Sequence, residues 1–137
     1  MEKETLSTIS SLNQDIRSFN PAVLVFDLPA MVEKMKQKRS WAKGKLNSKI
    51  LMKTPGKQIV LTTLHEGTQI KSFQSNDSIT FQVIEGKLLF HSRNESVKLD
   101  KGQLLTLYEN VNYSLTTNEK TVLLLTIESG GLQLSVN

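Results

Sequence analysis

The side chains that could do chemistry are few in this 137-residue sequence. It contains no cysteine and two histidines, His65 and His91. The lack of cysteine excludes disulfides, thiolate metal sites and cysteine nucleophiles. Two histidines alone do not make the converging set of imidazoles and carboxylates that a bound metal ion requires. We therefore expect neither a metal nor any other cofactor.

The hydroxyl groups of Tyr113 and Ser75 are the remaining candidates for chemistry. Tyr113 could serve as the general acid of an isomerase or lyase that needs no metal, with Ser75 as its companion. The sequence offers no base for either residue at a fixed spacing, and no glycine-rich phosphate loop. We therefore favour a protein that is not an enzyme over this metal-independent isomerase or lyase.

The elements that would position these residues begin with two predicted helices. Apolar residues at steps of three or four predict a helix over 5–19. The apolar run VLVF at 23–26 predicts a short strand. Asp27 as a cap and Pro29 in the first turn then indicate a second helix that ends at Gly44. The face of this helix that we expect to be buried carries Met31, Val32, Met35 and Trp41.

From about Lys45 onward the pattern changes from helical to short β-prone segments. Turn pairs such as Pro55-Gly56 and Lys101-Gly102 separate these segments. The predicted strands are KILMK, QIVLTTL, QIKSF, SITFQVIEG, KLLFH, SVKLD, QLLTLY, NYSLTT and TVLLLTI. Successive strands without intervening helices predict an all-β sandwich or barrel. The alternation within SITFQVIEG places Ile79, Phe81 and Val83 on the interior face.

The glycines around this strand match the frame of a known motif. Gly67 and Gly86 have the spacing of the glycines in the first motif of the small single-domain cupins, which the sequence resembles. Cupins are double-stranded β-helix jelly rolls, and many hold a metal through the His-x-His and Glu of this motif. Phe73, Ser75 and Ile79 occupy those ligand positions here. Phenylalanine and isoleucine cannot donate to a metal.

The second cupin motif is matched in the same incomplete way. Gly102 opens it, while Tyr108 and Asn110 stand at its proline and glycine positions. Tyr113 takes the position of the histidine ligand, and Thr117 that of the asparagine. The resemblance covers about residues 28 to 128 and implies an all-β cupin barrel, preceded by a short helical N-terminal segment, without the usual metal ligands.

The resemblance also implies a pocket where the metal would otherwise lie. Its expected lining comprises Phe73, Ser75, Ile79, Phe81, Val83 and Tyr113. A mostly apolar cavity with one or two hydroxyl groups suits a small apolar or amphipathic molecule. The alternative is that the same side chains pack together and fill the interior. Our leading hypothesis is a metal-free cupin-fold protein that binds such a molecule.

The expected organisation is one barrel domain with extensions. Residues 1–27 form an N-terminal arm of helix and strand, 28–130 the barrel domain with its leading helix, and 131–137 a tail. The apolar face of the arm needs a surface to cover it, which a homodimer would supply. No secretory signal and no membrane-spanning apolar run is visible, so we expect a cytoplasmic protein that does not bind membranes.

A basic segment precedes the strands. From Lys34 to Lys57 the sequence has several lysines and one arginine but no acidic residue. This could make the protein an adaptor for nucleic acid or for an acidic partner. With a single arginine and only Trp41 for stacking on bases, we favour a solvated basic surface and expect no binding of nucleic acid.

Overall fold

The computed structural model of the protein describes residues 23–38, 44, 46–71, 78–107 and 111–129. By its internal contacts the chain divides into two compact units, Met1–Lys38 and Arg39–Asn137. Among the described residues, the helix belongs to the first unit and every strand to the second. No helix in this part of the chain has the length and apolar character needed to span a membrane.

The helix of the first unit, α2 (Leu28–Lys36), begins where the sequence predicts it. The Asp27 carboxylate accepts a hydrogen bond from the amide of Ala30 at 3.2 Å, which satisfies one of the free N–H groups of the first turn. The side chains of Met31, Val32 and Met35 are buried, as expected. The predicted helix over 5–19 and Trp41 lie outside the described residues.

Two expectations for this unit are wrong. The helix ends at Lys36 and not at Gly44, because the amides of Gln37 and Lys38 bond to the carbonyls three residues earlier and tighten the last turn. The run VLVF does not form a strand: Phe26 makes a single β-bridge, and the three residues before it are exposed. Four β-prone residues form a strand only where another strand pairs along their length.

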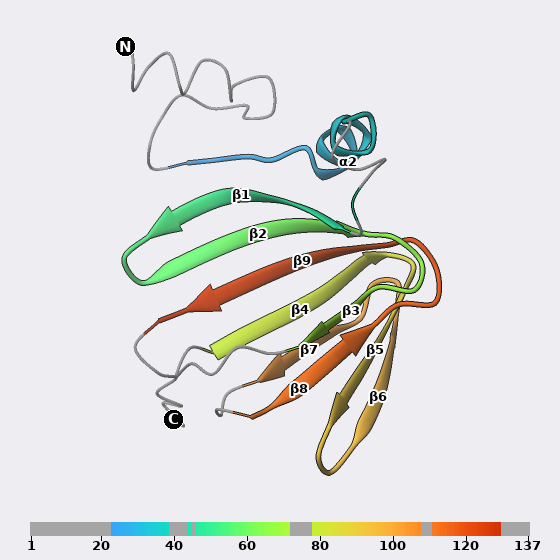
Figure 1. Cartoon of the computed structure of the whole chain (residues 1–137). Coiled ribbons are helices and arrows are strands. Elements are labelled where there is room, and N and C mark those ends of the chain that lie inside the picture. Colours follow the sequence, from blue (N-terminus) through green and yellow to red (C-terminus); the bar gives the residue numbers. More distant parts are fainter. Residues whose placement is uncertain (1–22, 39–43, 45, 72–77, 108–110, 130–137) are drawn as a thin grey trace. The chain divides into compact units, whose positions relative to one another are not determined.

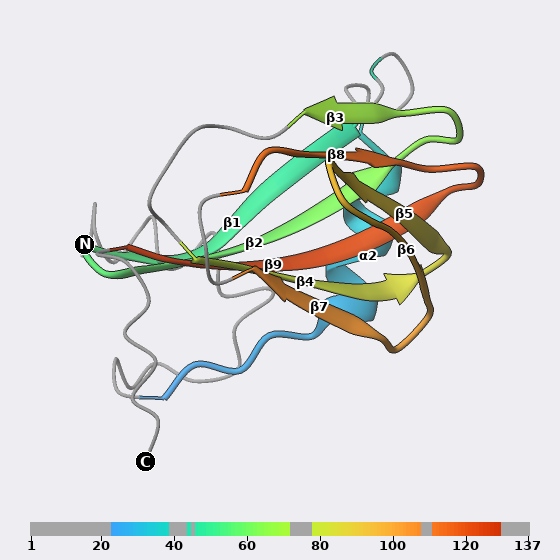
Figure 2. The ribbon, with the colours of Figure 1, turned by 90° about the horizontal axis from the view of Figure 1, so that it is seen from below.

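All nine predicted strands are present in the second unit. Their bounds are β1 Leu46–Thr54, β2 Lys57–Leu64, β3 Gln69–Lys71, β4 Ser78–Glu85, β5 Lys87–Ser92, β6 Ser96–Asp100, β7 Leu104–Leu107, β8 Tyr113–Thr116 and β9 Thr121–Glu128. They form a five-stranded sheet in the order β1-β2-β9-β4-β7 and a four-stranded sheet in the order β3-β8-β5-β6. Every pairing is antiparallel. Figures 1 and 2 show the larger sheet curving over the smaller one.

The core lies between the facing surfaces of the two sheets. Its buried members are Leu64, Phe81, Val83, Leu88, Phe90, Leu99, Leu115 and Leu123. Phe81 and Val83 belong to it and Ile79 packs against it, which confirms the predicted alternation along β4. Each fully buried leucine or phenylalanine stabilises the fold by about 1.5–3 kcal/mol relative to an exposed one.

Buried threonine hydroxyls fasten the strands at one end of the barrel. Thr117 donates to the carbonyl of His65 at 2.8 Å, and Thr68 donates to the same carbonyl at 2.7 Å. Thr121 contacts the carbonyls of Lys87 and Glu119, each at 2.9 Å. The carbonyls of His65 and Glu119 lie outside the strands, and these bonds give them partners. We call this the closed end; Thr117, at the asparagine position of the cupin motif, has a structural role there.

Gly86 lies at the same end and has two reasons to be glycine. Its φ of +85° belongs to the left-handed region, which side chains disfavour. A Cβ at this position would also meet the carbonyl oxygen of Lys120 and stand 2.7 Å from the hydroxyl of Thr121. Gly67 shares the positive φ but has open space around it. The positive φ alone explains glycine at Gly67, whereas at Gly86 the lack of space for a Cβ is a second reason.

The basic residues that the structure describes are divided between the two units. Lys34 and Lys36 lie in the last turn of α2, where positive charge is favourable to the helix dipole. Lys49, Lys53 and Lys57 lie on the hairpin formed by β1 and β2. The other basic residues of the segment, those between Lys38 and Leu46, lie outside the described residues. The tail 131–137 lies outside them as well.

Candidate functional site: the open end of the barrel

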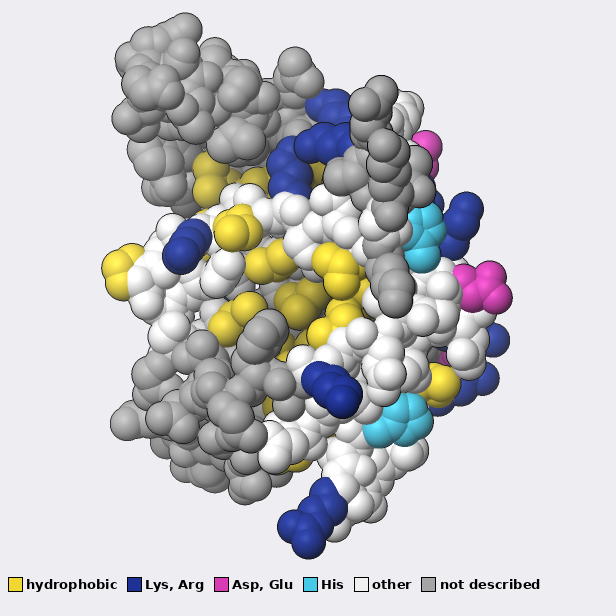
Figure 3. Space-filling view, viewed as in Figure 1, with side chains coloured by type: hydrophobic (Ala, Val, Ile, Leu, Met, Phe, Trp, Pro, Cys, Tyr) yellow, Lys and Arg dark blue, Asp and Glu magenta, His cyan; other side chains and the backbone are white. Residues whose placement is uncertain are grey.

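Burial falls off steadily along the barrel interior, away from the closed end. Val83 is 0% exposed and Phe81 is 1% exposed, whereas Ile79, the next inward residue of β4, is half-buried. Leu107 lies directly opposite Ile79, and the half-buried residues Leu105, Leu125 and Tyr113 lie next to Phe81. We define the open end by the half-buried residues Ile79, Leu105, Leu107, Tyr113 and Leu125. Figure 3 shows hydrophobic side chains gathered in a hollow between the two sheets.

Tyr113 is the residue of the open end that carries a polar group. Its ring meets Phe81 edge to face and stacks on Phe90, with ring centroids 5.5 Å apart in both pairs. Such geometries are favoured by the charge distribution of aromatic rings. Burial raises the pKa of the Tyr113 phenol above its usual 10.0, because the phenolate would lose solvation. The hydroxyl is therefore neutral near pH 7 and can both donate and accept a hydrogen bond.

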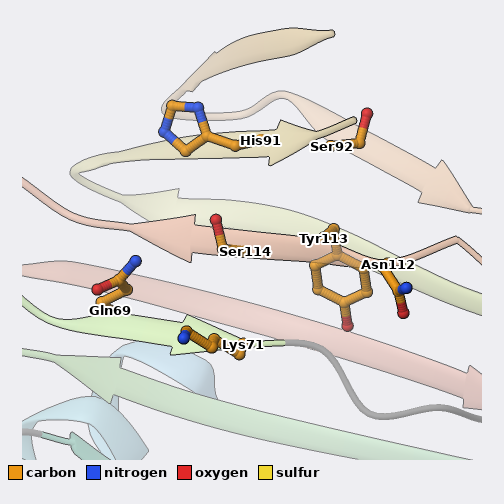
Figure 4. A pocket seen from close by; sticks show the side chains of 7 residues that line it. All are labelled: Gln69, Lys71, His91, Ser92, Asn112, Tyr113 and Ser114. Carbon is orange, nitrogen blue, oxygen red and sulfur yellow. The ribbon is translucent and has the colours of Figure 1, made fainter. Parts of the chain in front are cut away.

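A second concavity adjoins Tyr113 at the ends of three neighbouring strands. It has a volume of about 440 Å³ and is lined by Gln69, Lys71, His91, Ser92, Asn112, Tyr113 and Ser114. We call it the lateral hollow (Figure 4). Tyr113 and Ser114 point to opposite sides of β8, as adjacent strand residues must. The lateral hollow therefore wraps around the end of β8, and Tyr113 links it to the open end.

The structure brings four of the six predicted pocket residues together. Ile79 and Tyr113 lie at the open end, while Phe81 and Val83 lie beneath them in the core. Phe73 and Ser75 lie outside the described residues.

Apart from Tyr113, the sequence did not predict the polar side chains of the lateral hollow. They come from β3, β5 and the start of β8, and only the pairing of those strands makes them neighbours. On β5 and β8, polar residues such as His91 and Ser114 alternate with inward-facing apolar residues. This alternation is the signal that could have placed His91 and Ser114 on the same outer face of the smaller sheet.

The two histidines do not meet. His65 precedes the Gly67 turn, whereas His91 lies on β5, and they appear as separate patches in Figure 3. The Nδ1 of His91 lies 3.0 Å from the Ser96 hydroxyl, and its Nε2 lies 3.4 Å from the hydroxyl of Thr116. Both ring nitrogens are thus within reach of hydroxyl partners on adjacent strands. Within the described ranges, no three histidine, cysteine or acidic side chains cluster as a metal site.

Comparison with known proteins identifies the fold. No protein-family profile matches the sequence, and no curated protein matches it. Among solved structures, the Clostridium difficile EutQ protein superposes with a TM-score of 0.65 at 14% identity, over 82% of this chain and 85% of that one. The cupin domain of Schizosaccharomyces pombe Cnp3 gives 0.62 at 16% identity, over 82% of both chains. The protein has the cupin fold.

Proteins of different kinds share this fold. Ectoine synthase from P. lautus superposes with a TM-score of 0.61 at 18% identity, over 77% of this chain and 78% of that one. Such identities establish the architecture and leave function to the residues of the site. Among the described interior residues, Ile79, Phe81 and Val83 of β4 offer no donor atom to a metal of the cupin type, and Tyr113 offers a single phenol oxygen.

Proposed function

We propose that the protein is a metal-free, non-enzymatic binding protein that holds a small apolar or amphipathic molecule at the open end of its barrel. The observation that carries this proposal is the fall in burial from Val83 and Phe81 to Ile79 and Leu107. Half-buried apolar side chains at a concave site lose contact with water when a ligand covers them. That loss is worth about 25 cal/mol for each Å² of apolar surface.

Tyr113 supplies the directional part of the proposed binding. Its ring is fixed by Phe81 and Phe90, so the hydroxyl is presented in a defined position at the edge of an apolar site. A mostly apolar pocket with a few placed polar groups is the usual form of a small-molecule site. The ligand would therefore combine an apolar body with a group that hydrogen-bonds to a neutral phenol.

Two leucines of β7 allow a matched test. Leu107 faces the interior opposite Ile79, whereas Leu104 faces outward and is 56% exposed. The probe is N-phenyl-1-naphthylamine, a neutral aromatic molecule whose fluorescence rises in apolar surroundings. We expect Leu107→Gln to weaken its binding about tenfold, since one apolar contact of about 1.4 kcal/mol is lost. Leu104→Gln should leave it unchanged.

The controls for this test are thermal unfolding and circular dichroism, which should show both variants folded. If the wild-type protein does not bind the probe, or if the two variants weaken binding equally, the open end is not the binding site.

One observation favours a second candidate, a metal-independent isomerase or lyase. His91 and Tyr113 line the same lateral hollow, which supplies an imidazole that interior positions lack. The proximity of both His91 nitrogens to the hydroxyls of Ser96 and Thr116 speaks against a free base. The protein with its bound small molecule is incubated in D2O, and the small molecule is then recovered. An unchanged mass and deuterium content of that molecule would support binding alone. Its conversion, lost in His91→Asn, would support the enzyme.

A further inference from the structure

The charge of the lateral hollow is one-sided. Among the seven residues that line it, Lys71 is cationic, none is acidic, and the others offer hydroxyl, amide or imidazole groups. Within the described residues, Lys71 makes no ion pair with a carboxylate. An unpaired ammonium group beside neutral hydrogen-bond donors favours an anion.

Strand register sets Lys71 directly opposite one of those donors. In the ladder between β3 and β8, Lys71 pairs with Ser114, and in the ladder between β8 and β5, Ser114 pairs with His91. Side chains of directly opposed residues in antiparallel strands are close neighbours, with Cβ atoms about 5 Å apart. The three side chains therefore form a row across three strands (Figure 4).

Two members of this row remain available to a ligand. The ring of His91 lies within reach of Ser96 and Thr116 through both nitrogens. The hydroxyl of Ser114, in contrast, forms no hydrogen bond to another residue of the described ranges. Lys71 and Ser114 thus present an ammonium and a hydroxyl group from directly paired positions of neighbouring strands. This pair matches the two oxygens of a carboxylate, which accept charge-assisted hydrogen bonds.

We propose that the lateral hollow binds the carboxylate of an amphipathic acid through Lys71 and Ser114, while the apolar part of that acid lies against Tyr113 and the open end. This inference rests on the proposed function and names its ligand class. A single lysine suits the single charge of a carboxylate better than a phosphate group, which arginine forks or several cations usually hold. Tyr113 borders both concavities, so a molecule that bends around the start of β8 contacts both.

The test compares octanoate with octanamide, two molecules that share one chain and differ in charge. Each competes with bound N-phenyl-1-naphthylamine, and the concentration that displaces half of the probe is measured. We expect octanoate to displace it from the wild-type protein at about a tenfold lower concentration than octanamide. Lys71→Met should remove this difference, and Ser114→Ala should reduce it severalfold.

The matched control is Lys98→Met, which removes the same charge from an exposed position on β6. It should keep the preference for octanoate. Equal displacement by the acid and the amide in the wild-type protein would overturn the carboxylate site and leave the proposed function standing. A preference for octanoate that survives Lys71→Met would overturn the assignment of the carboxylate to Lys71. Failure of N-phenyl-1-naphthylamine to bind at all would overturn the proposed function and this inference together.

Discussion

The ring of Tyr113 meets the ring of Phe81 edge to face, with 5.5 Å between their centroids and 74° between their planes. Phe81 is a fully buried residue of β4, and Tyr113 opens β8 in the other sheet. The pair therefore joins the two sheets at the boundary between the packed core and the open end. It makes the stability of the barrel and the shape of the candidate site depend on the same ring.

Substitutions at Tyr113 should separate these two contributions. Tyr113→Ala removes the ring contacts with Phe81 and Phe90, and we expect it to lower the free energy of unfolding by about 2–3 kcal/mol. Tyr113→Phe keeps the ring and should change it by less than about 1 kcal/mol. Urea unfolding followed by circular dichroism gives both values. Equal losses in the two variants would show that the hydroxyl, and not the ring, joins the sheets.

The raised pKa of Tyr113 predicts a dependence of stability on alkaline pH. The folded protein disfavours the phenolate form of Tyr113, so the pKa of this phenol is higher in the folded than in the unfolded protein. The stability that the neutral phenol contributes is therefore fully present below pH 10.0. It is lost as the pH rises through the pKa of the folded protein. The unfolding midpoint of the wild-type protein should therefore fall more between about pH 9 and pH 11 than that of Tyr113→Phe. In a Tyr108→Phe background, the near-ultraviolet phenolate absorbance should titrate above pH 10.0. Titration at or below that value would contradict the burial of the phenol.

Gly86 should tolerate alanine far less well than Gly102. Both have a positive φ, so each alanine costs about 1–2 kcal/mol in backbone strain. At Gly86 the new Cβ would also collide with the main chain at Lys120, whereas Gly102 has open space. We expect Gly86→Ala to cost at least about 2 kcal/mol more than Gly102→Ala. Chemical denaturation measures this difference in the free energy of unfolding. Equal costs would mean that the main chain at Lys120 moves away easily and makes room for the new Cβ.

The threonine bonds of the closed end predict that Thr121→Val destabilises the barrel despite its nearly unchanged shape. The substitution leaves the carbonyls of Lys87 and Glu119 without the hydroxyl that contacts them. Thr121 itself is buried, and the loss of a hydrogen bond there typically costs about 0.5–1.5 kcal/mol. Thr106→Val, at an exposed threonine of β7, is the matched control and should change stability by less than about 0.5 kcal/mol. Comparable melting temperatures for the two variants would contradict a role of these bonds.

We also expect the protein to be a homodimer. The edge strand β1 exposes Leu46 and Ile50, the latter by 52%, and the segment Val23–Val25 is exposed as well. Ile50→Lys should shift the protein toward monomer, while Leu104→Lys, on the opposite edge strand β7, should not. Light scattering at micromolar concentration reads the mass directly. A monomeric wild-type protein under these conditions would refute the expectation.

The sequence predicts the barrel better than it predicts the site. Turn residues and alternation locate nine strands and place Phe81 and Val83 inside, because burial on one face imposes a period of two on each strand. The helix end at Lys36 was missed, since closing the last turn needs no glycine. The lateral hollow was missed for a different reason. Only the pairing of β3, β8 and β5 makes Lys71, Ser114 and His91 neighbours. The order of strands along the chain does not determine which strands pair in the sheet.

The place of β9 in the larger sheet has a consequence for the way the chain must acquire its structure. β9 is the last strand of the described residues, yet it lies between β2 and β4 and pairs with both along nearly its whole length. Until residues 121–128 have left the ribosome, β2 and β4 each lack this neighbour and keep an unpaired edge. The larger sheet therefore closes only after synthesis of β9, in a slow step dominated by contacts between distant parts of the chain.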